Sequence, residues 1–313
     1  MNVLFIGLGS IGTRHLQNLH TVATEKGIAL SVDALRSGNG RALPAETKAM
    51  LTREIAVLSA DAHYDAAFIT NPTNLHFDTL KLLRGKADTL FIEKPIFEDA
   101  KKENALADCL VPGQKAYVAA PMRWCGTMLA LKEKLPQLHV YSARVLCSSY
   151  LPNWRPNVDY RTVYSAHKDM GGGVTIDLIH EWDYLAELFG MPEQIYNFKG
   201  KYSHLEIDSD DVSIYIARYK TLLCEVHLDY FGRSYRRSIE LFCEDGTVTA
   251  DFGAGTLTLA DGTVQTQIEP VNARYLREMN YFVDYANSGV GESVNTPATA
   301  RKVLQLTLGE AVK

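Results

Sequence analysis

The chain begins with residues 1–12, MNVLFIGLGSIG, and this stretch decides the fold. Val3–Ile6 is a short apolar run typical of a buried strand, and it leads directly into the glycine-rich motif GLGSIG at residues 7–12. A helix is expected over Thr13–Thr24, where leucine and valine recur with helical spacing. A strand, a G-x-G-x-x-G turn and a helix in this order indicate a dinucleotide-binding unit.

Each residue of the motif has an expected part in such a site. Gly7 permits the tight turn, Gly9 lets the backbone approach a pyrophosphate, and Gly12 allows close packing of helix on strand. Ser10 and Ile11 lie at the helix N-terminus, which attracts anionic phosphates, and are expected in the same site. The alternative is a glycine-rich turn that only packs.

The alternation of strands and helices continues to about residue 120. This spacing predicts a doubly wound parallel sheet, that is, an α/β Rossmann domain. Further strands are expected at Ile28–Leu35, Ala66–Thr70, Thr89–Ile92 and Ala116–Ala119, with helices at Thr47–Ser59, 75–83 and Ala100–Ala107.

The second half of the chain has a different rhythm. A helix at Met128–Leu135 and a strand at His139–Ser148 precede a polar, aromatic loop and then an apolar helix at 171–190. Residues 194–268 read as consecutive strands with short turns, and helices are expected at Ala273–Asn287 and from Pro297. We therefore predict two domains, 1–121 and 122–313, the second an α+β domain with an open, mostly antiparallel sheet.

Composition excludes several classes of protein. The formal net charge of −5 gives no general attraction to nucleic acid or an anionic membrane. No segment approaches the roughly 20 consecutive apolar residues that cross a bilayer, and the N-terminus lacks the cationic flank of a signal peptide. The five cysteines are far apart and form no C-x-x-C pair, so we expect a cytoplasmic protein without disulfides or a thiolate metal site.

The end of the second strand should select the cofactor. NAD sites usually place an acid there for the ribose hydroxyls. Asp33 lies about 20 residues after the glycines, but more strand follows it, and Arg36 and Ser37 are expected at the tip. A cation beside a hydroxyl suits a 2′-phosphate, so the sequence favours NADP over NAD, unless Arg36 is an ordinary surface residue.

Two polar motifs follow later strands of the predicted sheet. Ligands of a parallel sheet bind at the carboxyl ends of its strands. Glu93 and Lys94 lie at such a position, and Lys94 is expected to point toward the cofactor. The other motif, TNPTNLH, ends the strand before it and supplies five further candidate cofactor ligands: Thr70, Asn71, Pro72, Asn74 and His76.

The helix expected at 171–190, GGGVTIDLIHEWDYLAELFG, carries polar side chains in an apolar setting. Asp177, His180 and Asp183 are spaced three residues apart, which would place them along one helix face. An imidazole is suited to proton transfer near neutral pH. The alternatives are a core histidine with satisfied hydrogen bonds, or a metal site that uses Asp177, His180 and a remote ligand; no other ligand cluster supports the metal site.

Together, these motifs resemble the Gfo/Idh/MocA oxidoreductase family. The resemblance implies a Rossmann domain followed by a domain with an open sheet, a nicotinamide cofactor, and oxidation or reduction of sugars, cyclitols and related polyols. It also implies a homodimer or homotetramer that assembles through the C-terminal sheet. The stretch YLPNWRPNVDYR resembles a subgroup associated with surface-polysaccharide and acidic-sugar pathways.

The resemblance also implies catalytic residues. The family's catalytic lysine corresponds to Lys94, and its aspartate and histidine correspond to Asp177 and His180. Many members space the last two as D-x-x-x-H, whereas this chain has D-x-x-H. Asp177 is expected to orient a substrate hydroxyl or His180, while Asp183 is a second candidate for orienting the imidazole.

The loop 149–161 is expected to cover the substrate. Trp154 and Tyr160 offer flat faces on which sugars stack, and Arg155 and Arg161 could hold a carboxylate or phosphate. Arg123 is expected to join them. The leading interpretation is an NAD(P)-dependent sugar dehydrogenase or reductase. The alternatives are a cofactor-bound sensor without turnover, and an epimerase or lyase that uses the cofactor transiently.

Overall fold

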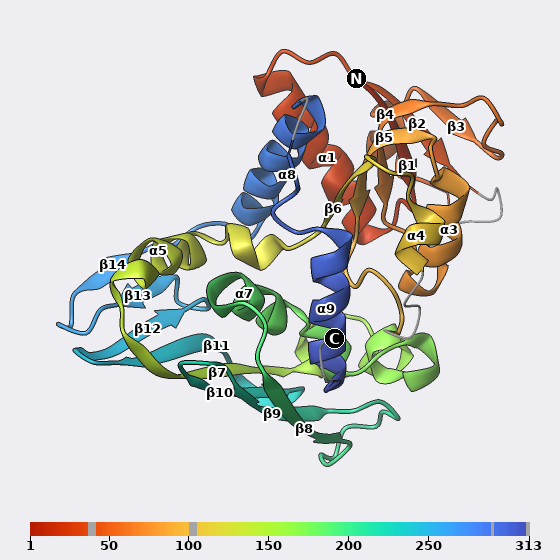
Figure 1. Ribbon diagram of the computed structural model, residues 1–313. Helices are drawn as coiled ribbons and strands as arrows, with labels where there is room; N and C mark the ends of the chain where they lie inside the picture. Colours follow the sequence, from red (N-terminus) through yellow and green to blue (C-terminus); the bar gives the residue numbers. More distant parts are fainter. Residues whose placement is uncertain (37–41, 100–104, 289–290, 311–313) are drawn as a thin grey trace. The chain divides into compact units, whose positions relative to one another are not determined.

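The computed structural model describes residues 1–36, 42–99, 105–288 and 291–310 (Figure 1). The chain divides into two compact units. Unit 1 consists of Met1–Ala119 with Tyr275–Arg301, and unit 2 of Ala120–Arg274 with Lys302–Lys313.

Unit 1 is built on a parallel sheet with the strand order β3-β2-β1-β4-β5-β6. The strand order reverses beside β1: β2 and β3 extend the sheet to one side of β1, and β4, β5 and β6 extend it to the other, as in a Rossmann domain. This confirms the predicted α/β fold. The strands are β1 (Asn2–Ile6), β2 (Ser31–Leu35), β3 (Arg53–Ile55), β4 (Tyr64–Ile69), β5 (Ala87–Ile92) and β6 (Lys115–Val118).

The helices of unit 1 match the expectations except at one place. They are α1 (Ser10–Glu25), α2 (Ala45–Ala49), α3 (His76–Leu83), α4 (Ala105–Cys109) and α8 (Asn272–Asn287). The helix expected over Thr47–Ser59 is wrong, because α2 is short and β3 follows it. Arg53 extends the sheet there, since its guanidinium binds the buried Asp33 on β2. Of the helix expected at Ala100–Ala107, residues 100–104 lie outside the described part.

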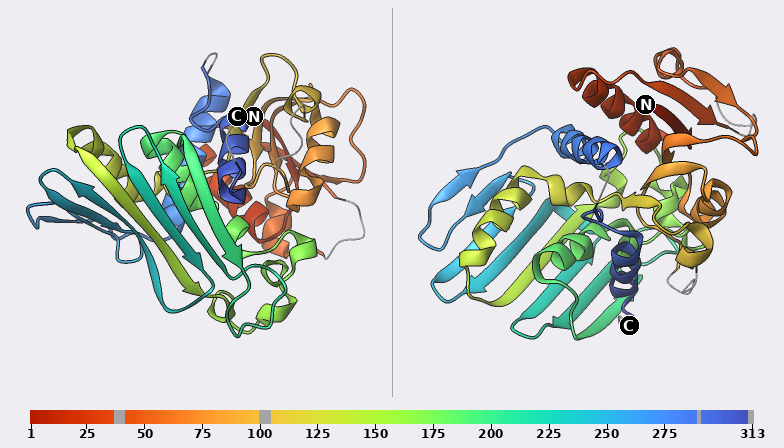
Figure 2. Two further views of the ribbon diagram at one scale, coloured as in Figure 1. Left: turned by 60° about the horizontal axis from the view of Figure 1, so that its bottom comes forward. Right: turned by 45° about the horizontal axis from the view of Figure 1, so that its top comes forward.

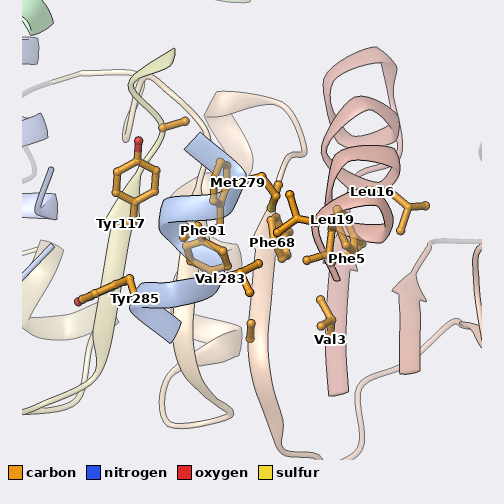
Figure 3. Packing of buried hydrophobic residues seen from close by; sticks show 14 of the residues in the cluster. Val3, Phe5, Leu16, Leu19, Phe68, Phe91, Tyr117, Met279, Val283 and Tyr285 are labelled. Atoms are coloured by element: carbon orange, nitrogen blue, oxygen red, sulfur yellow. The ribbon is translucent and has the colours of Figure 1, made fainter. Parts of the chain in front are cut away.

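The core of unit 1 includes a segment from late in the chain. Met279, Phe282 and Val283 form the apolar stripe of α8 and pack against the sheet, where Phe282 meets Phe68 and Phe91 edge to face. Figure 3 shows Met279 and Val283 on this helix and Phe68 and Phe91 on the sheet. The predicted division assigns all of 122–313 to the second domain, whereas residues 275–301 belong to unit 1. Burial of this stripe on the first sheet explains the difference.

Unit 2 contains an eight-stranded sheet with the order β14-β13-β12-β11-β7-β10-β9-β8. Its neighbours are antiparallel except for β7 and β10, which run parallel, so the mostly antiparallel sheet is confirmed. The strands are β7 (Val140–Tyr150), β8 (Gln194–Gly200), β9 (Val212–Arg218), β10 (Leu223–Asp229), β11 (Phe231–Cys243), β12 (Gly246–Asp251), β13 (Thr256–Thr258) and β14 (Val264–Thr266).

The two faces of this sheet have different environments. Helices α5 (Gly126–Lys134) and α7 (His180–Phe189) cover one face, here called the inner face (Figure 2). On that face Trp182 packs edge to face on Tyr215. The outer face carries exposed apolar side chains, among them Tyr196 and Phe198. The remaining helices are α6 (Val174–Asp177) and α9 (Pro297–Leu308). Within the described ranges, no helix is both long and apolar enough to cross a membrane.

Candidate active site

The three glycines of the first motif have different surroundings. A Cβ on Gly7, whose φ is +96°, would lie 2.4 Å from the Asn71 nitrogen, and a Cβ on Gly12 would lie 2.1 Å from the Gly7 carbonyl oxygen. A Cβ on Gly9 would meet no atom within 4 Å. Gly7 and Gly12 are therefore required by packing, whereas Gly9 leaves open space into which a ligand can fit.

The N-terminus of α1 fits a bound phosphate. Gly9 precedes the helix and provides no side-chain cap, and the first turn, which includes Ser10 and Ile11, carries no acidic residue. The first N–H groups of a helix have no partners within it and attract anions. The residues of this turn therefore fit the pyrophosphate of a dinucleotide.

Asp33 is a structural residue. Its carboxylate accepts hydrogen bonds from Arg53 at 3.0 and 2.5 Å and from the Tyr64 hydroxyl at 3.0 Å. The hydrogen bond from Arg53 is the main reason that the pKa of Asp33 lies below its ordinary value. These partners hold the carboxylate within the sheet and account for it without a ribose.

Arg36 lies directly after β2. Its Nη1 atom lies 3.1 Å from Oε2 of Glu54, and Lys48 lies 3.4 Å from the other oxygen of that carboxylate. Two cations therefore flank one carboxylate at the position expected to select the cofactor. Ser37, the other residue expected there, lies outside the described residues.

The loop after β4 combines supporting and exposed residues. The Thr70 hydroxyl binds the Gly7 carbonyl, and the Asn71 amide donates to Thr79 at 2.8 Å. The His76 ring, expected at the cofactor, is buried between the carbonyls of Asn71 and Ile96, and burial lowers its pKa. His76 is therefore a support of the loop. Pro72 and Asn74 are exposed at its surface.

Glu93 is a buried supporting residue, whereas its neighbour Lys94 is partly exposed. The Glu93 carboxylate, expected at the cofactor, is buried and lies 2.6 Å from Nε2 of His15 on α1. Burial pushes the pKa of Glu93 upward, but the hydrogen bond and charge of His15, with the charge of Lys94, hold it below its ordinary value. Lys94 is partly exposed at the carboxyl end of β5. Sequence reasoning missed His15, whose signal was a lone histidine among the apolar residues of α1.

The helix expected at 171–190 is interrupted. It begins at Val174 because Gly173, at φ +131°, turns the chain, and α6 ends at Asp177. Hydrogen bonds from Ile179 to Ile176 and from Glu181 to Leu178 span three residues and separate α6 from α7. Asp177 and His180 therefore lie on two helices, and the expectation of one continuous helix face is wrong.

Asp177 binds two tyrosines. Its Oδ1 atom accepts from the Tyr164 hydroxyl at 2.6 Å, and its Oδ2 atom accepts from the Tyr230 hydroxyl at 2.5 Å. Burial raises the pKa of both tyrosines, and the negative charge of Asp177 adds to the effect. Sequence reasoning missed both tyrosines, which lie far from the helix motif or in the loop before it.

Arg123 and the carboxylates of α7 form a buried network. Nε and Nη2 of Arg123 donate to the two oxygens of Asp183 at 2.8 and 2.9 Å, and Nη1 donates to Glu187 at 2.7 Å. Arg237 binds Glu181 in the same manner, at 2.7 and 3.1 Å. Arg123, expected to bind substrate, instead holds α7 in place. His180 is the half-buried first residue of that helix.

The expected substrate loop contains a pocket. Arg161 forms ion pairs with Asp159 and Glu206, and its expected role in substrate binding stays a prediction. Arg155 lies 5.8 Å from the Tyr164 ring centre, and Trp154 packs edge to face on Tyr230. The pocket is lined by Leu151, Pro152, Trp154, Arg155, Val158, Tyr160, Val163 and Ser165. Trp154, Arg155 and Tyr160 are thus brought together, beside the tyrosines that bind Asp177.

Possible metal ligands among the described residues are not clustered as the residues of the pocket are. In the part of the chain that the structure describes, no group of three or more histidine, cysteine, aspartate or glutamate side chains could hold a metal ion. The carboxylates near His180 have tyrosine or arginine partners.

The N-terminal part of the chain matches a known family of proteins. Residues 1–118 match the Gfo/Idh/MocA model, described as an oxidoreductase family with an NAD-binding Rossmann fold. The uncharacterized oxidoreductase YrbE of Bacillus subtilis (strain 168) is 24% identical over 318 residues, covering 96% of this chain and 89% of YrbE.

Two solved structures share the fold over nearly their whole length. Levoglucosan dehydrogenase, in complex with NADH and levoglucosan, has a TM-score of 0.81 at 15% identity, covering 99% of this chain and 95% of that one. The WlbA dehydrogenase of Bordetella pertussis, in complex with NADH and UDP-GlcNAcA, has a TM-score of 0.76 at 18% identity, covering 100% and 95%. Residues 1–118 are thus similar to the Gfo/Idh/MocA family of oxidoreductases with an NAD-binding Rossmann fold, and the chain as a whole shares the fold of these two solved structures.

Proposed function

We propose that this protein is an NADP(H)-dependent oxidoreductase that acts on a secondary hydroxyl or keto group of a sugar or sugar derivative. The observation that carries the proposal is the carboxyl end of the parallel sheet in unit 1. There the uncapped N-terminus of α1 fits a pyrophosphate, and Lys94 stands at the end of β5. Phosphate recognition suits a dinucleotide, and a partly exposed cation can stabilise negative charge that develops on a reacting oxygen.

Lys94 and His180 divide the acid–base work in this proposal. A nicotinamide cofactor, when bound, would supply or accept the hydride. The Lys94 ammonium donates a hydrogen bond to the reacting oxygen and stabilises the negative charge that develops on it. The His180 imidazole takes the hydroxyl proton during oxidation and returns it during reduction. Asp177 acts through Tyr164 and Tyr230, which it binds.

The preference for NADP rests on the tip of β2. Arg36 and Lys48 supply two positive charges beside the single carboxylate of Glu54. A 2′-phosphate can replace that carboxylate as the partner of the Arg36 guanidinium, which binds phosphate bidentately. Asp33, the acid that would favour NAD, is held by Arg53 and Tyr64.

The proposed substrate is a sugar with an acidic group. Trp154 and Tyr160 line the loop pocket with aromatic faces, and Arg155 places a guanidinium at the same pocket. This combination suits a polyol ring that carries a carboxylate or phosphate. The names of the two solved relatives, one with levoglucosan and one with UDP-GlcNAcA, support a sugar-type substrate.

Nicotinamide absorbance with a panel of substrates tests the proposal. The panel contains neutral sugars, cyclitols, free sugar acids and nucleotide-linked sugar acids, each with NADP and NAD. We expect turnover with NADP and an acidic sugar, and a loss of about 10³-fold or more in kcat for Lys94→Ala. Lys86→Ala is the matched control, because Lys86 precedes β5 at its other end. Absence of turnover across the panel would reject the enzymatic assignment.

We also propose that the protein is a homodimer or homotetramer in the cytoplasm. Its five cysteines are free thiols, four of them buried, which suits a reducing compartment. The outer face of the sheet in unit 2 supports self-association, because aromatic and aliphatic side chains are exposed there. Subcellular fractionation tests the location, and the mass in solution tests the assembly.

A further inference from the structure

We infer that His15 and Glu93 form a buried positioning pair that fixes the backbone at Lys94. The role of Lys94 itself rests on the proposed function, but the pair is defined by contacts within unit 1 alone. His15 would act through Glu93 and would touch neither substrate nor cofactor. It is therefore a positioning residue for the reaction.

Hydrogen bonds connect α1 to Lys94 through these two side chains. Nε2 of His15 lies 2.6 Å from Oε1 of Glu93, and Oε2 of Glu93 accepts the backbone N–H of Lys94 at 3.0 Å. Each oxygen of the carboxylate thus has one partner. Helix α1, whose N-terminus fits the cofactor phosphates, is thereby coupled to the lysine at the end of β5.

The surroundings of His15 indicate that its imidazole is required for the contact with Glu93. The ring has no exposed surface and packs against Phe91 at 4.7 Å and Tyr275 at 6.1 Å between ring centres. Among the described residues, its Nδ1 atom has no hydrogen-bond partner. Packing alone would be served by an apolar residue, which would leave no buried polar atom unsatisfied. Within the described part of the chain, the contact with Glu93 is therefore the polar interaction that accounts for the histidine.

The backbone leaves the sheet at the residue that this pair holds. The Glu93 N–H still donates to the Ile69 carbonyl at 2.9 Å, as the next rung beside β4. The following N–H, that of Lys94, donates to the Glu93 carboxylate instead. The Glu93 carboxylate therefore sets the direction of the chain where Lys94 begins. A displacement of about 1 Å at a reacting group can lower the rate by roughly 10²-fold.

Helix α1 offers a matched control. His20 lies five residues after His15 on the same helix, and its Nε2 atom lies 3.0 Å from the Met50 carbonyl oxygen. A His20→Leu variant removes one imidazole and one hydrogen bond from α1 without changing a contact of Glu93. General weakening of α1 would affect both variants alike.

The first experiment compares His15→Leu, His15→Gln and His20→Leu in steady-state turnover, NADPH binding and thermal unfolding. We expect His15→Leu to lower kcat by about 10²-fold with little change in the NADPH dissociation constant. His15→Gln, whose amide can still donate to Glu93, should lose less than about tenfold, and His20→Leu should keep the kcat of the parent. Full kcat in His15→Leu, or equal losses in the leucine and glutamine variants, would overturn the inference.

The second experiment needs no substrate. NMR-detected hydrogen exchange of the Lys94 amide reports its bond to Glu93 directly. We expect His15→Leu to speed this exchange roughly fivefold, the factor that corresponds to one typical hydrogen bond, while His15→Gln and His20→Leu leave it near the parent value. Unchanged exchange in His15→Leu would reject the pair. If the parent protein turns over no substrate, the proposed function fails, and this measurement still decides whether the pair exists.

Discussion

The Asp177 carboxylate shows how a buried charge is held in this fold. It receives two hydroxyl hydrogen bonds, from Tyr164 and from Tyr230, and a buried carboxylate without donors would be strongly destabilising. Trp154 packs on Tyr230, so the same contacts also support the wall of the loop pocket. Asp177 is therefore coupled to the pocket through aromatic side chains.

Removal of one of these hydroxyls should destabilise the protein. We expect Tyr230→Phe to lower the free energy of unfolding by about 1–3 kcal/mol, because one oxygen of the buried Asp177 loses its donor. Urea denaturation of the parent and the variant measures the difference. Tyr141→Phe is the control, since Tyr141 is exposed. Equal midpoints for Tyr230→Phe and the parent would show that the Tyr230 hydroxyl contributes nothing to stability.

Arg36 allows a direct test of cofactor choice. We expect Arg36→Ala to weaken NADPH binding by roughly tenfold or more relative to NADH, because a charged hydrogen bond to the 2′-phosphate is lost. Fluorescence titration with both reduced cofactors measures the ratio. Asp33→Asn is the companion variant: it should lower the melting temperature, through the Arg53 and Tyr64 contacts, without changing the ratio. A ratio unaffected by Arg36→Ala would contradict the NADP assignment.

For single residues, the sequence does not determine which group a charged side chain binds. Arg123 and Arg155 both looked suited to an anionic substrate, yet the structure gives Arg123 the carboxylates of Asp183 and Glu187. The partners lie some 60 residues away, and their proximity follows from how α7 packs. Local patterns show that a side chain is charged, but tertiary packing decides what it binds.

At the scale of elements, α7 is fixed by two arginines. Arg123 binds the buried Asp183 and the partly exposed Glu187, and Arg237 binds the fully buried Glu181. Such pairs add little stability relative to an apolar core, but loss of one partner leaves an uncompensated charge. The arginines thereby constrain the helix that begins with His180.

Two arginine variants should separate support from substrate binding. We expect Arg123→Ala to destabilise the protein by about 3–5 kcal/mol, because the buried Asp183 carboxylate loses the guanidinium that binds both of its oxygens. Arg155→Ala should leave stability within about 0.5 kcal/mol, since Arg155 is exposed, while raising KM for an acidic sugar. Denaturation curves and initial rates provide both values. The reverse pattern, with KM changed only by Arg123→Ala, would show that the roles are exchanged.

Elements with regular patterns could be predicted, and those decided by long-range partners could not. The apolar run at Val3–Ile6 and the strand at Thr89–Ile92 are buried strands as expected. The expected helix over Thr47–Ser59 gives way to β3, because Arg53 pairs with Asp33 on the neighbouring strand. No proline marks the break between α6 and α7 in the sequence. The break is seen in the backbone hydrogen bonds and in the backbone angles of Leu178.

The whole chain contains many tyrosines whose ionisation folding suppresses. Burial raises the pKa of Tyr64 to about 12 and raises those of Tyr164, Tyr184, Tyr215 and Tyr230 well above the ordinary value. A raised pKa in the folded state contributes stability that is complete below the unfolded pKa near 10 and is lost as pH rises beyond it.

Alkaline titration should therefore be cooperative. We expect the tyrosinate absorbance near 295 nm to lag behind that of the protein in guanidinium, and then to rise together with the loss of far-ultraviolet circular dichroism above about pH 10. A full tyrosinate signal reached with the secondary structure intact would contradict the buried, protonated state of these residues.

The exposed face of the sheet in unit 2 bears on the assembly of the molecule. Strand register places Tyr196 beside Ile216 and Phe198 beside Ile214, and all four side chains are exposed. Figure 2 (left) looks onto this face, with α5 and α7 behind it. Farther along the sheet, Arg144 lies between Glu225 and Glu240 on the neighbouring strands. An apolar area bordered by a charged ladder is typical of an interface between subunits.

A charge placed on this face should therefore prevent self-association. We expect the parent protein to have the mass of a dimer or tetramer, and Phe198→Asp to shift it toward the monomer, because a desolvated carboxylate would lie without a partner in an apolar interface. Light scattering coupled to size-exclusion chromatography measures the mass. Val57→Asp is the control, since Val57 is equally exposed but belongs to unit 1. Should Phe198→Asp retain the parent's oligomeric mass, the subunits must associate through another surface.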